Sequence, residues 1–241
     1  MRLKVLGSGS SGNCYMLEND KEALIIEAGL PFREVKKALD FNVMKIKAVI
    51  TTHFHIDHSL YSLQYVQAGI PVFEPCRPPI KYSAMRFRKG NFDIMAFENR
   101  DKSGRWLHNN GDGSECPCVG FYITHPEMGS LVYATDTEYV RWRFNGVNHI
   151  MVEANYDMQF VNREEPNYER RLRGHMSLPT ALDFISTNDN PALRNVVLIH
   201  LSDKSGDPAL FKQKTEETVK YGANVYIAEK GLEVDMNLCP F

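Results

Sequence analysis

Apolar residues follow two kinds of spacing along the chain. In one kind, short apolar or β-branched runs stand between Gly, Ser, Asn and Asp residues, which is typical of strands joined by turns. In the other, apolar residues recur every three or four positions, as Phe32, Val35 and Leu39 do after Pro31, which is typical of helices packed by one face. The expected strands are residues 3–6, 14–17, 23–27, 47–51, 92–97, 119–124, 130–134, 148–152, 196–200, 224–228 and 232–234, and the expected helices are residues 32–39, 60–68, 80–88, 157–171, 177–185 and 208–221.

Two of these segments have clear boundary signals. Residues 125–129 form a turn sequence between two apolar runs and predict a hairpin, and Ser177 with Pro179 is a good start for the helix that follows. The chain contains no internal repeat, low-complexity tract or linker-like stretch. We therefore expect a single domain over residues 1–241.

Composition narrows the class of protein. The chain has 241 residues, of which 43% are hydrophobic and 24% charged, as in an ordinary soluble globular protein. It has no apolar run of about 18 residues, so a membrane-spanning helix is not expected. The first residues lack the apolar core of a secretory signal, and the five cysteines are an odd, scattered set, so we expect reduced thiols in a cytoplasmic protein. The net charge of −2 gives no general attraction to nucleic acid, so such a partner needs a local patch.

The strongest chemical signal follows the apolar run at residues 47–51. His53, His55, Asp57 and His58 lie within six positions at the start of a helical pattern. Side chains two positions apart at the end of a strand can point to one side, so His53 and His55 can bind one ion, while Asp57 and His58 can face a second. Imidazoles with a carboxylate suit zinc or manganese. The spacing predicts metal binding rather than a solvated polar loop.

This HxHxDH pattern resembles the metallo-β-lactamase superfamily. The resemblance implies an α+β fold, an αββα sandwich of two packed mixed β-sheets flanked by helices, with metals at one edge of the sheets. It implies further ligands at His108 (with His125 as the competing position), at the bridging Asp136 and at His200.

The resemblance divides the ligands between two divalent ions, zinc or manganese. His53, His55 and His108 would bind one ion, Asp57, His58 and His200 the other, and Asp136 would bridge them. One position departs from the family pattern: Glu27 stands where the family has an aspartate that supports a metal ligand.

Three other segments resemble small, single-domain bacterial and phage phosphodiesterases or exonucleases of this superfamily. These are the glycine-serine loop at residues 6–13, residues 151–157, and Gly174-His175-Met176-Ser177. The resemblance implies that Glu153 orients His175, which protonates the leaving oxygen. A helix-capping role is the alternative for the His175 segment.

Substrate contacts are expected from the same segments. Ser10, Ser11 and Asn13 of the glycine-serine loop can hold a phosphate through N–H and hydroxyl groups, although a plain turn between strands fits the composition equally. Arg173 and Ser177 flank His175 and are expected to contact substrate too.

Basic residues gather in two parts of the sequence, where they can either bind phosphate or simply keep the surface hydrated. The first cluster contains Arg77, Lys81, Arg86, Arg88, Lys89, Arg100, Lys102 and Arg105, interleaved with Tyr82, Phe87 and Phe92; the second contains Arg163, Arg170, Arg171 and Arg173.

These features predict a dinuclear metal-dependent phosphodiesterase with exonuclease-like action on nucleic acid or another phosphodiester, no membrane partner, and Asp57, His175 and Glu153 as catalytic residues. A metal-bridging hydroxide would attack phosphorus. The alternatives are a metallo-hydrolase of a carbonyl ester, lactam or thioester, and a non-catalytic metal-binding module. The sequence does not indicate an oligomeric state.

Overall fold

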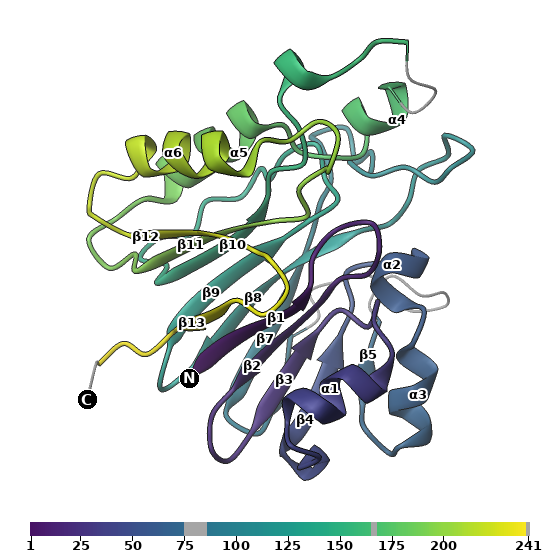
Figure 1. Ribbon diagram of the computed structural model, residues 1–241, viewed down its shortest axis with the longest axis vertical. Coiled ribbons are helices and arrows are strands. Elements are labelled where there is room, and N and C mark those ends of the chain that lie inside the picture. The colour runs from purple at the N-terminus through teal and green to yellow at the C-terminus, as the bar shows by residue number, and fades with distance from the viewer. Residues whose placement is uncertain (75–85, 165–167, 240–241) are drawn as a thin grey trace. The chain divides into compact units, whose positions relative to one another are not determined.

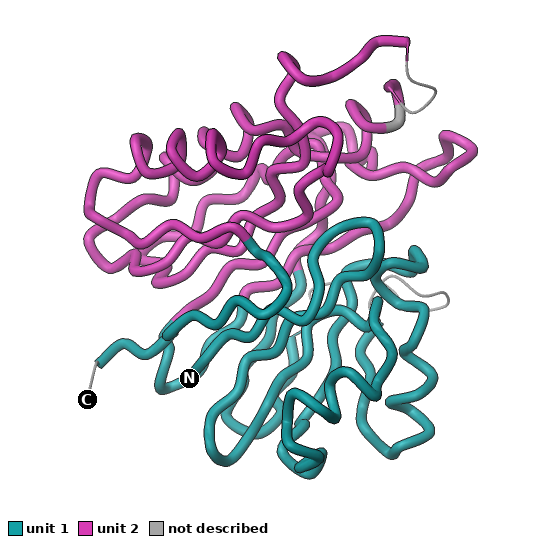
Figure 2. The backbone as a smooth tube through the Cα atoms, in the orientation of Figure 1, with its two compact units in different colours: residues 1–96, 123–129, 228–241 teal, residues 97–122, 130–227 magenta. Residues whose placement is uncertain are grey.

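The computed structural model describes residues 1–74, 86–164 and 168–239, apart from the side chain of Arg170. The chain forms two compact units, which Figure 2 distinguishes by colour. Unit 1 contains Met1–Ala96, Ile123–Gly129 and Ala228–Phe241, and unit 2 contains Phe97–Tyr122 and Ser130–Ile227. The single domain over residues 1–241 stays a prediction.

Unit 1 is built on a mixed sheet with the strand order β13-β1-β2-β3-β4-β5. The pairs from β13 to β3 are antiparallel, whereas β3, β4 and β5 are parallel, so the chain crosses over between them through α1 and then through α2 and α3. The strands of this sheet are β1 (Arg2–Gly7), β2 (Cys14–Glu18), β3 (Ala23–Ile26), β4 (Ile46–Ile50), β5 (Val72–Phe73) and β13 (Glu233–Asp235).

The remaining elements of unit 1 are short. The helices are α1 (Phe32–Ala38), the 3-10 turn Val43–Lys45, α2 (Ile56–Ser59) and α3 (Ser62–Gln67), and the antiparallel hairpin is β6 (Arg86–Lys89) with β7 (Phe92–Glu98), whose last two residues belong to unit 2. Phe32 and Val35 of α1 and Tyr65 of α3 are buried with Ile25 and Val49 of the sheet. Helices therefore cover the sheet, and the apolar stripe of α1 is the one expected from the sequence.

The second sheet has the strand order β12-β11-β10-β9-β8-β7-β6. In unit 2, β9, β10, β11 and β12 are parallel, so their carboxyl ends lie along one edge. The strands are β8 (Val119–His125), β9 (Gly129–Ala134), β10 (His149–Glu153), β11 (Asn195–Ile199) and β12 (Asn224–Ile227); the helices are the 3-10 turn Met158–Phe160, α4 (Tyr168–Leu172), α5 (Leu178–Asn188) and α6 (Pro208–Thr218).

The core of unit 2 lies between this sheet and two helices. α5 and α6 run side by side over the strands (Figure 1), and Phe184 and Phe211 are buried with Ile150, Val196 and Leu198. α5 begins as the sequence predicts, because the Ser177 hydroxyl accepts a hydrogen bond from the backbone N–H of Thr180 and Pro179 stands in the first turn.

Three expected helices differ from the structure. The helix expected at residues 60–68 is present but shorter, as α3, because the N–H of Tyr61 donates to Ala28 O at 3.0 Å and the helix begins only at Ser62. Residues 157–171 are not one helix: Asp157 caps the turn Met158–Phe160, and α4 starts only at Tyr168, after Pro166. The expected helix at 80–88 lies mostly outside the described residues, and its last three residues, 86–88, belong to strand β6. None of the described helices is long and apolar enough to cross a membrane.

Candidate metal centre and its two ligand sets

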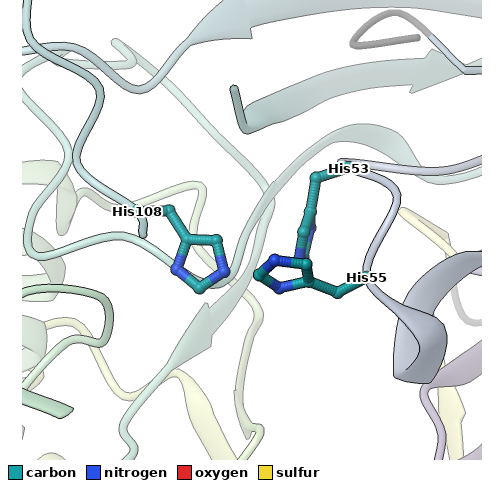
Figure 3. Close-up of side chains that lie close together, drawn as sticks. All are labelled: His53, His55 and His108. Atoms are coloured by element: carbon teal, nitrogen blue, oxygen red, sulfur yellow. The ribbon is translucent and has the colours of Figure 1, made fainter. Parts of the chain in front are cut away.

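Four of the predicted ligands lie in unit 1, with His53 and His55 on the loop between β4 and α2 and Asp57 and His58 in α2. His53 and His58 are buried, while His55 and Asp57 are partly exposed. The rings of His53 and His55 meet edge to face with centroids 4.6 Å apart, and Figure 3 shows both on this loop. The His53 and His58 rings are 4.3 Å apart. The close spacing in sequence therefore becomes a compact group of imidazoles.

Glu27 supports two of these histidines. Its side chain is fully buried, and its Oε1 accepts a hydrogen bond from the Thr52 hydroxyl at 2.7 Å and lies 3.3 Å from His58 Nδ1. Since the Thr52 hydroxyl donates to Glu27, it accepts from His53 Nδ1, which is 2.9 Å away. One carboxylate thus fixes His58 directly and His53 through Thr52. The glutamate thus contacts the candidate ligands, as the resemblance implies for an aspartate at this position.

The glycine-serine loop is tied to the same histidine loop. Asn13 is fully buried, its Nδ2 lies 3.0 Å from His58 Nε2 and 3.3 Å from Asp57 O, and its Oδ1 accepts from the N–H of Gly9 at 2.8 Å. A Cβ on Gly29 would lie 1.9 Å from Asp57 O, so only glycine allows this approach. The structure therefore shows Asn13 packed against the candidate ligands rather than facing solvent.

The second ligand set lies in unit 2. Asp136 follows β9, Glu153 ends β10 and His200 follows β11, so three neighbouring parallel strands deliver their side chains to one edge. Asp136, Glu153, His175 and His200 offer ligand atoms that all lie within 4.8 Å of one another, a group that could hold a metal ion. His108 belongs to this set too, with its Nε2 3.9 Å from Asp136 Oδ1.

Glu153 organises this second set. Its Oε1 lies 2.7 Å from His175 Nδ1 and 2.9 Å from His200 Nδ1, and its Oε2 accepts from the N–H of Met176 at 3.1 Å. Burial opposes ionisation of this carboxyl, but the charge of His175 and the hydrogen bonds from both histidines outweigh burial and lower the pKa of Glu153. The Glu153–His175 contact that the sequence predicts is present, and Glu153 contacts His200 in addition.

Three of the candidate ligands share one arrangement. The Nδ1 atoms of His53, His108 and His200 each face a hydrogen-bond acceptor of the protein: Thr52 Oγ1, Gly174 O (2.7 Å) and Glu153 Oε1. An Nδ1–H that donates in this way leaves the Nε2 lone pair for a ligand, which is the usual state of metal-binding histidines. The residues present therefore fit a divalent metal ion.

Among the described residues, three of the five non-glycine residues with a positive φ stand at the same places. Glu27, Asp136 and His200 have φ values of 67°, 50° and 54°, in the left-handed region that side chains other than glycine rarely adopt. Each of them directly follows a strand or stands two residues after it. Non-glycine residues in this region cluster at functional sites.

The competing ligand His125 has a different environment. It is buried in unit 1, its Nε2 lies 3.2 Å from Glu22 Oε1, and its Nδ1 accepts from the N–H of Glu127 at 3.2 Å. Both ring nitrogens therefore bond to the protein. This geometry favours His108 over His125.

The remaining predicted site residues are partly at the surface. Ser10 and Ser11 are exposed, as a substrate contact requires, and Arg173 is exposed with an ion pair to Glu169 at 3.8 Å. Ser177 is only partly exposed and its hydroxyl caps α5. The capping alternative thus holds for Ser177, while His175 is bonded to Glu153.

Much of the first basic cluster is already paired. Arg86 and Arg88 both contact Asp93, and Arg105 contacts Asp101 and Glu138. Arg100 stacks on Trp106, 3.8 Å from the ring centroid. Arg77, Lys81 and Tyr82 lie outside the described residues. For the paired arginines the structure favours a role in holding the surface together.

Two supporting groups had no signal in the sequence. Thr52 is one of many threonines, and only the structure shows it between Glu27 and His53. Gly174 acts through its carbonyl oxygen, which no side-chain pattern reveals.

Comparison with known proteins supplies the family. The model of the metallo-β-lactamase superfamily matches residues 7–139, more than half of the chain. Exodeoxyribonuclease YycJ of Bacillus anthracis is 23% identical over 261 aligned residues, covering 97% of this chain and 92% of that protein. Exodeoxyribonuclease WalJ of Streptococcus pneumoniae D39 is 24% identical, covering 85% of this chain and 82% of that protein.

Solved structures agree on the fold. The metallo-β-lactamase fold protein YhfI of Bacillus subtilis has a TM-score of 0.67 at 17% identity, with 97% of this chain and 98% of that chain covered. The short form of human tRNase Z has a TM-score of 0.59 at 13% identity, with 98% and 99% covered. The predicted fold class is therefore confirmed. The chain belongs to the metallo-β-lactamase superfamily and is a hydrolase of that superfamily.

Proposed function

We propose that this hydrolase is a phosphodiesterase that acts on nucleic acid, with exonuclease-like action. Catalysis would depend on two divalent metal ions. The two relatives described above are named exodeoxyribonucleases, which supports a nucleic-acid substrate.

The observation that carries the proposal is the contact between Glu153 and His175. Glu153 is fully buried and faces Nδ1 of the partly exposed His175, so the carboxylate holds the imidazole by that nitrogen. An imidazole held at Nδ1 by a carboxylate 2.7 Å away can act as a proton donor through its other ring nitrogen. Cleavage of a nucleic-acid phosphodiester expels a sugar alkoxide, a poor leaving group that needs such a proton.

The metal ligands of the proposal are those predicted from the sequence: His53, His55, Asp57, His58, His108, Asp136 and His200. Imidazole and carboxylate donors suit Zn²⁺, with Mn²⁺ as the alternative. Divalent ions, when bound, supply Lewis-acid stabilisation of the charge that develops on phosphoryl oxygens. The protein residues would orient the substrate and deliver the proton.

Substrate binding is assigned to exposed groups. Ser10, Ser11 and Arg173 are free of the buried networks that hold Asn13 and Ser177, so they would contact phosphate oxygens. Asn13 would act on substrate only indirectly, by holding Asp57 and His58.

The proposal is tested by digestion of 5′- and 3′-labelled single- and double-stranded DNA and RNA in the presence of Zn²⁺ or Mn²⁺. Metal-dependent release of mononucleotides from one end is the expected result. Parallel assays use bis-nitrophenyl phosphate, a chromogenic β-lactam and a glutathione thioester. Turnover of the lactam or thioester without cleavage of any phosphodiester would overturn the proposal in favour of carbonyl hydrolysis.

Two controls complete this experiment. Asp57→Ala should abolish cleavage without unfolding the chain, and chelator-treated protein should regain activity when metal is returned. Metal-free protein that fails to bind added Zn²⁺ or Mn²⁺ and hydrolyses none of these substrates would indicate a non-catalytic module.

A further inference from the structure

His175 takes its position from the last turn of α4. Its backbone N–H donates to Arg171 O at 3.1 Å, and the N–H of Gly174 donates to the same oxygen at 3.5 Å. The Gly174 carbonyl in turn accepts from His108 Nδ1 at 2.7 Å. The turn that starts at Arg171 therefore fixes the position of His175. Through the Gly174 carbonyl it also fixes the orientation of His108, a candidate metal ligand.

α4 has little stability of its own. It spans only Tyr168–Leu172, far below the length at which a helix is stable in water by itself. The preceding residues 161–164 have no regular secondary structure. A histidine that must stay 2.7 Å from a buried carboxylate therefore needs an anchor from elsewhere in unit 2.

The side chain of Arg171 provides that anchor. Its Nη1 donates to Ser205 Oγ at 2.7 Å, and Ser205 is 1% exposed. Ser205 belongs to the loop that follows His200: its N–H donates to Ser202 Oγ at 3.3 Å, and its carbonyl accepts from the N–H of Asp157 at 3.0 Å. Arg171 thus joins the turn that carries His175 to the loop that carries His200.

From this geometry we infer that Arg171 is a positioning residue for the reaction, acting with Ser205. It holds the His175 turn and the His200 loop together, so that the Nδ1 atoms of both histidines meet Glu153 Oε1. The sequence groups Arg171 with arginines that can bind phosphate, but its guanidinium bonds to a buried serine. The inference rests on the proposed function, in which His175 delivers the proton.

The positioning role has a measurable signature. Displacing the acid by a fraction of an ångström slows the step that needs its proton, whereas loss of a phosphate contact weakens substrate binding. Arg171→Met should therefore lower kcat on labelled DNA by about tenfold or more, with little change in KM and a much smaller loss on bis-nitrophenyl phosphate. Ser205→Ala should shift kcat in the same direction, and Arg171→Lys, which keeps a donor, should recover part of the loss.

The matched control lies on the same helix. Glu169→Gln removes an exposed charge that pairs with the exposed Arg173 at 3.8 Å and takes no part in the Arg171–Ser205 contact, so it should leave kcat unchanged. An Arg171→Met variant that raises KM and keeps kcat on both substrates would overturn the inference, because it would make Arg171 a phosphate contact. So would equal losses in Arg171→Met and Glu169→Gln.

A second measurement does not depend on activity. Hydrogen exchange followed by mass spectrometry should show faster exchange over residues 169–176 and 200–206 in Arg171→Met than in the wild-type chain, and no change in Glu169→Gln. If the wild-type chain cleaves no phosphodiester, the proposed function fails while this measurement still decides the role of Arg171. Unchanged exchange in Arg171→Met would overturn the positioning role even in an active nuclease.

Discussion

The Oε1 atom of the buried Glu153 carboxylate lies 2.7 Å from His175 Nδ1, and the same oxygen also contacts Nδ1 of His200. One oxygen atom therefore serves a candidate acid and a candidate metal ligand together. Changes to Glu153 should therefore affect both the orientation of His175 and that of His200.

Replacing His175 should discriminate between leaving groups. His175→Ala removes the proton donor, so we expect the rate on labelled DNA to fall by about 10²–10⁴-fold. Nitrophenolate leaves without a proton, so the loss on bis-nitrophenyl phosphate should stay below about tenfold. Steady-state rates on the two substrates measure this, and equal losses would contradict the acid role.

Glu27→Gln should weaken metal binding. The carboxylate holds His58 directly and His53 through Thr52, and loss of such support typically costs about 10–100-fold in metal affinity. Titration calorimetry with Zn²⁺ measures the change. Glu216→Gln, an exposed residue of α6, is the control and should bind metal like the wild-type chain. Unchanged affinity in Glu27→Gln would show that the two histidines keep their orientation without the charge.

Removing metal should lower stability. A ligand that binds only the folded chain stabilises it by about 2.7 kcal/mol at a concentration one hundred times its Kd. The midpoint of thermal unfolding of chelator-treated protein should therefore rise as Zn²⁺ or Mn²⁺ is added, and rise less in Asp57→Ala. A midpoint independent of metal would argue against a resident ion.

The buried Glu22 should give the stability a pH dependence. Burial raises its pKa, but hydrogen bonds from the backbone and side chain of Asn91 and the contact with His125 outweigh burial, so the net effect is a lowered pKa. A carboxyl with a lowered pKa adds stability above its unfolded pKa of about 4.3, and that stability is lost as pH falls through the folded value.

Glu22→Gln isolates this contribution. At pH 7 we expect the free energy of unfolding to be about 1–3 kcal/mol lower than in the wild-type chain, because a charged hydrogen-bond acceptor is lost. The difference should shrink as pH drops below about 4. Urea unfolding across this pH range measures it, and a constant difference would rule out the carboxylate as its source.

Gly29→Ala tests the close approach of the three backbone segments around Asn13. The new methyl would lie 1.9 Å from Asp57 O and 2.6 Å from Asn13 N, so the backbone must move, at a cost of about 1–3 kcal/mol or more. Gly146→Ala is a useful comparison, since its methyl meets nothing within 4 Å and only its φ of 69° is unfavourable. Urea unfolding of both variants should show the larger loss at Gly29, and the reverse order would contradict the packing.

Much of the fold can be predicted from the periodicity of apolar residues, because burial in the core imposes that periodicity. The strands around Ile25, Val49 and Leu198 are buried on both faces, and uninterrupted apolar runs follow from that burial. The segment 157–171 has a helical pattern only in part, and its actual structure depends on Asp157 capping a short turn. The spacing of apolar residues does not show that this short turn forms in place of a continuous helix.

The candidate site, too, can be predicted from the sequence only in part. His53, His55, Asp57 and His58 are close in sequence, so their grouping follows from local geometry. The supports of these residues depend on distant contacts, such as Thr52 between Glu27 and His53, or the Gly174 carbonyl on His108. Pairings of this kind appear only when the chain is folded, which is why the sequence identifies Glu27 as unusual without showing what it holds.

The left-handed backbone at Glu27, Asp136 and His200 has a consequence for the evolution of this chain. Each non-glycine residue held there costs about 1–3 kcal/mol, which glycine would avoid. Selection for thermal stability alone should therefore replace these three positions with glycine and discard the carboxylates and the imidazole. Their presence in the natural sequence indicates that these side chains are retained for their chemistry at a cost in stability.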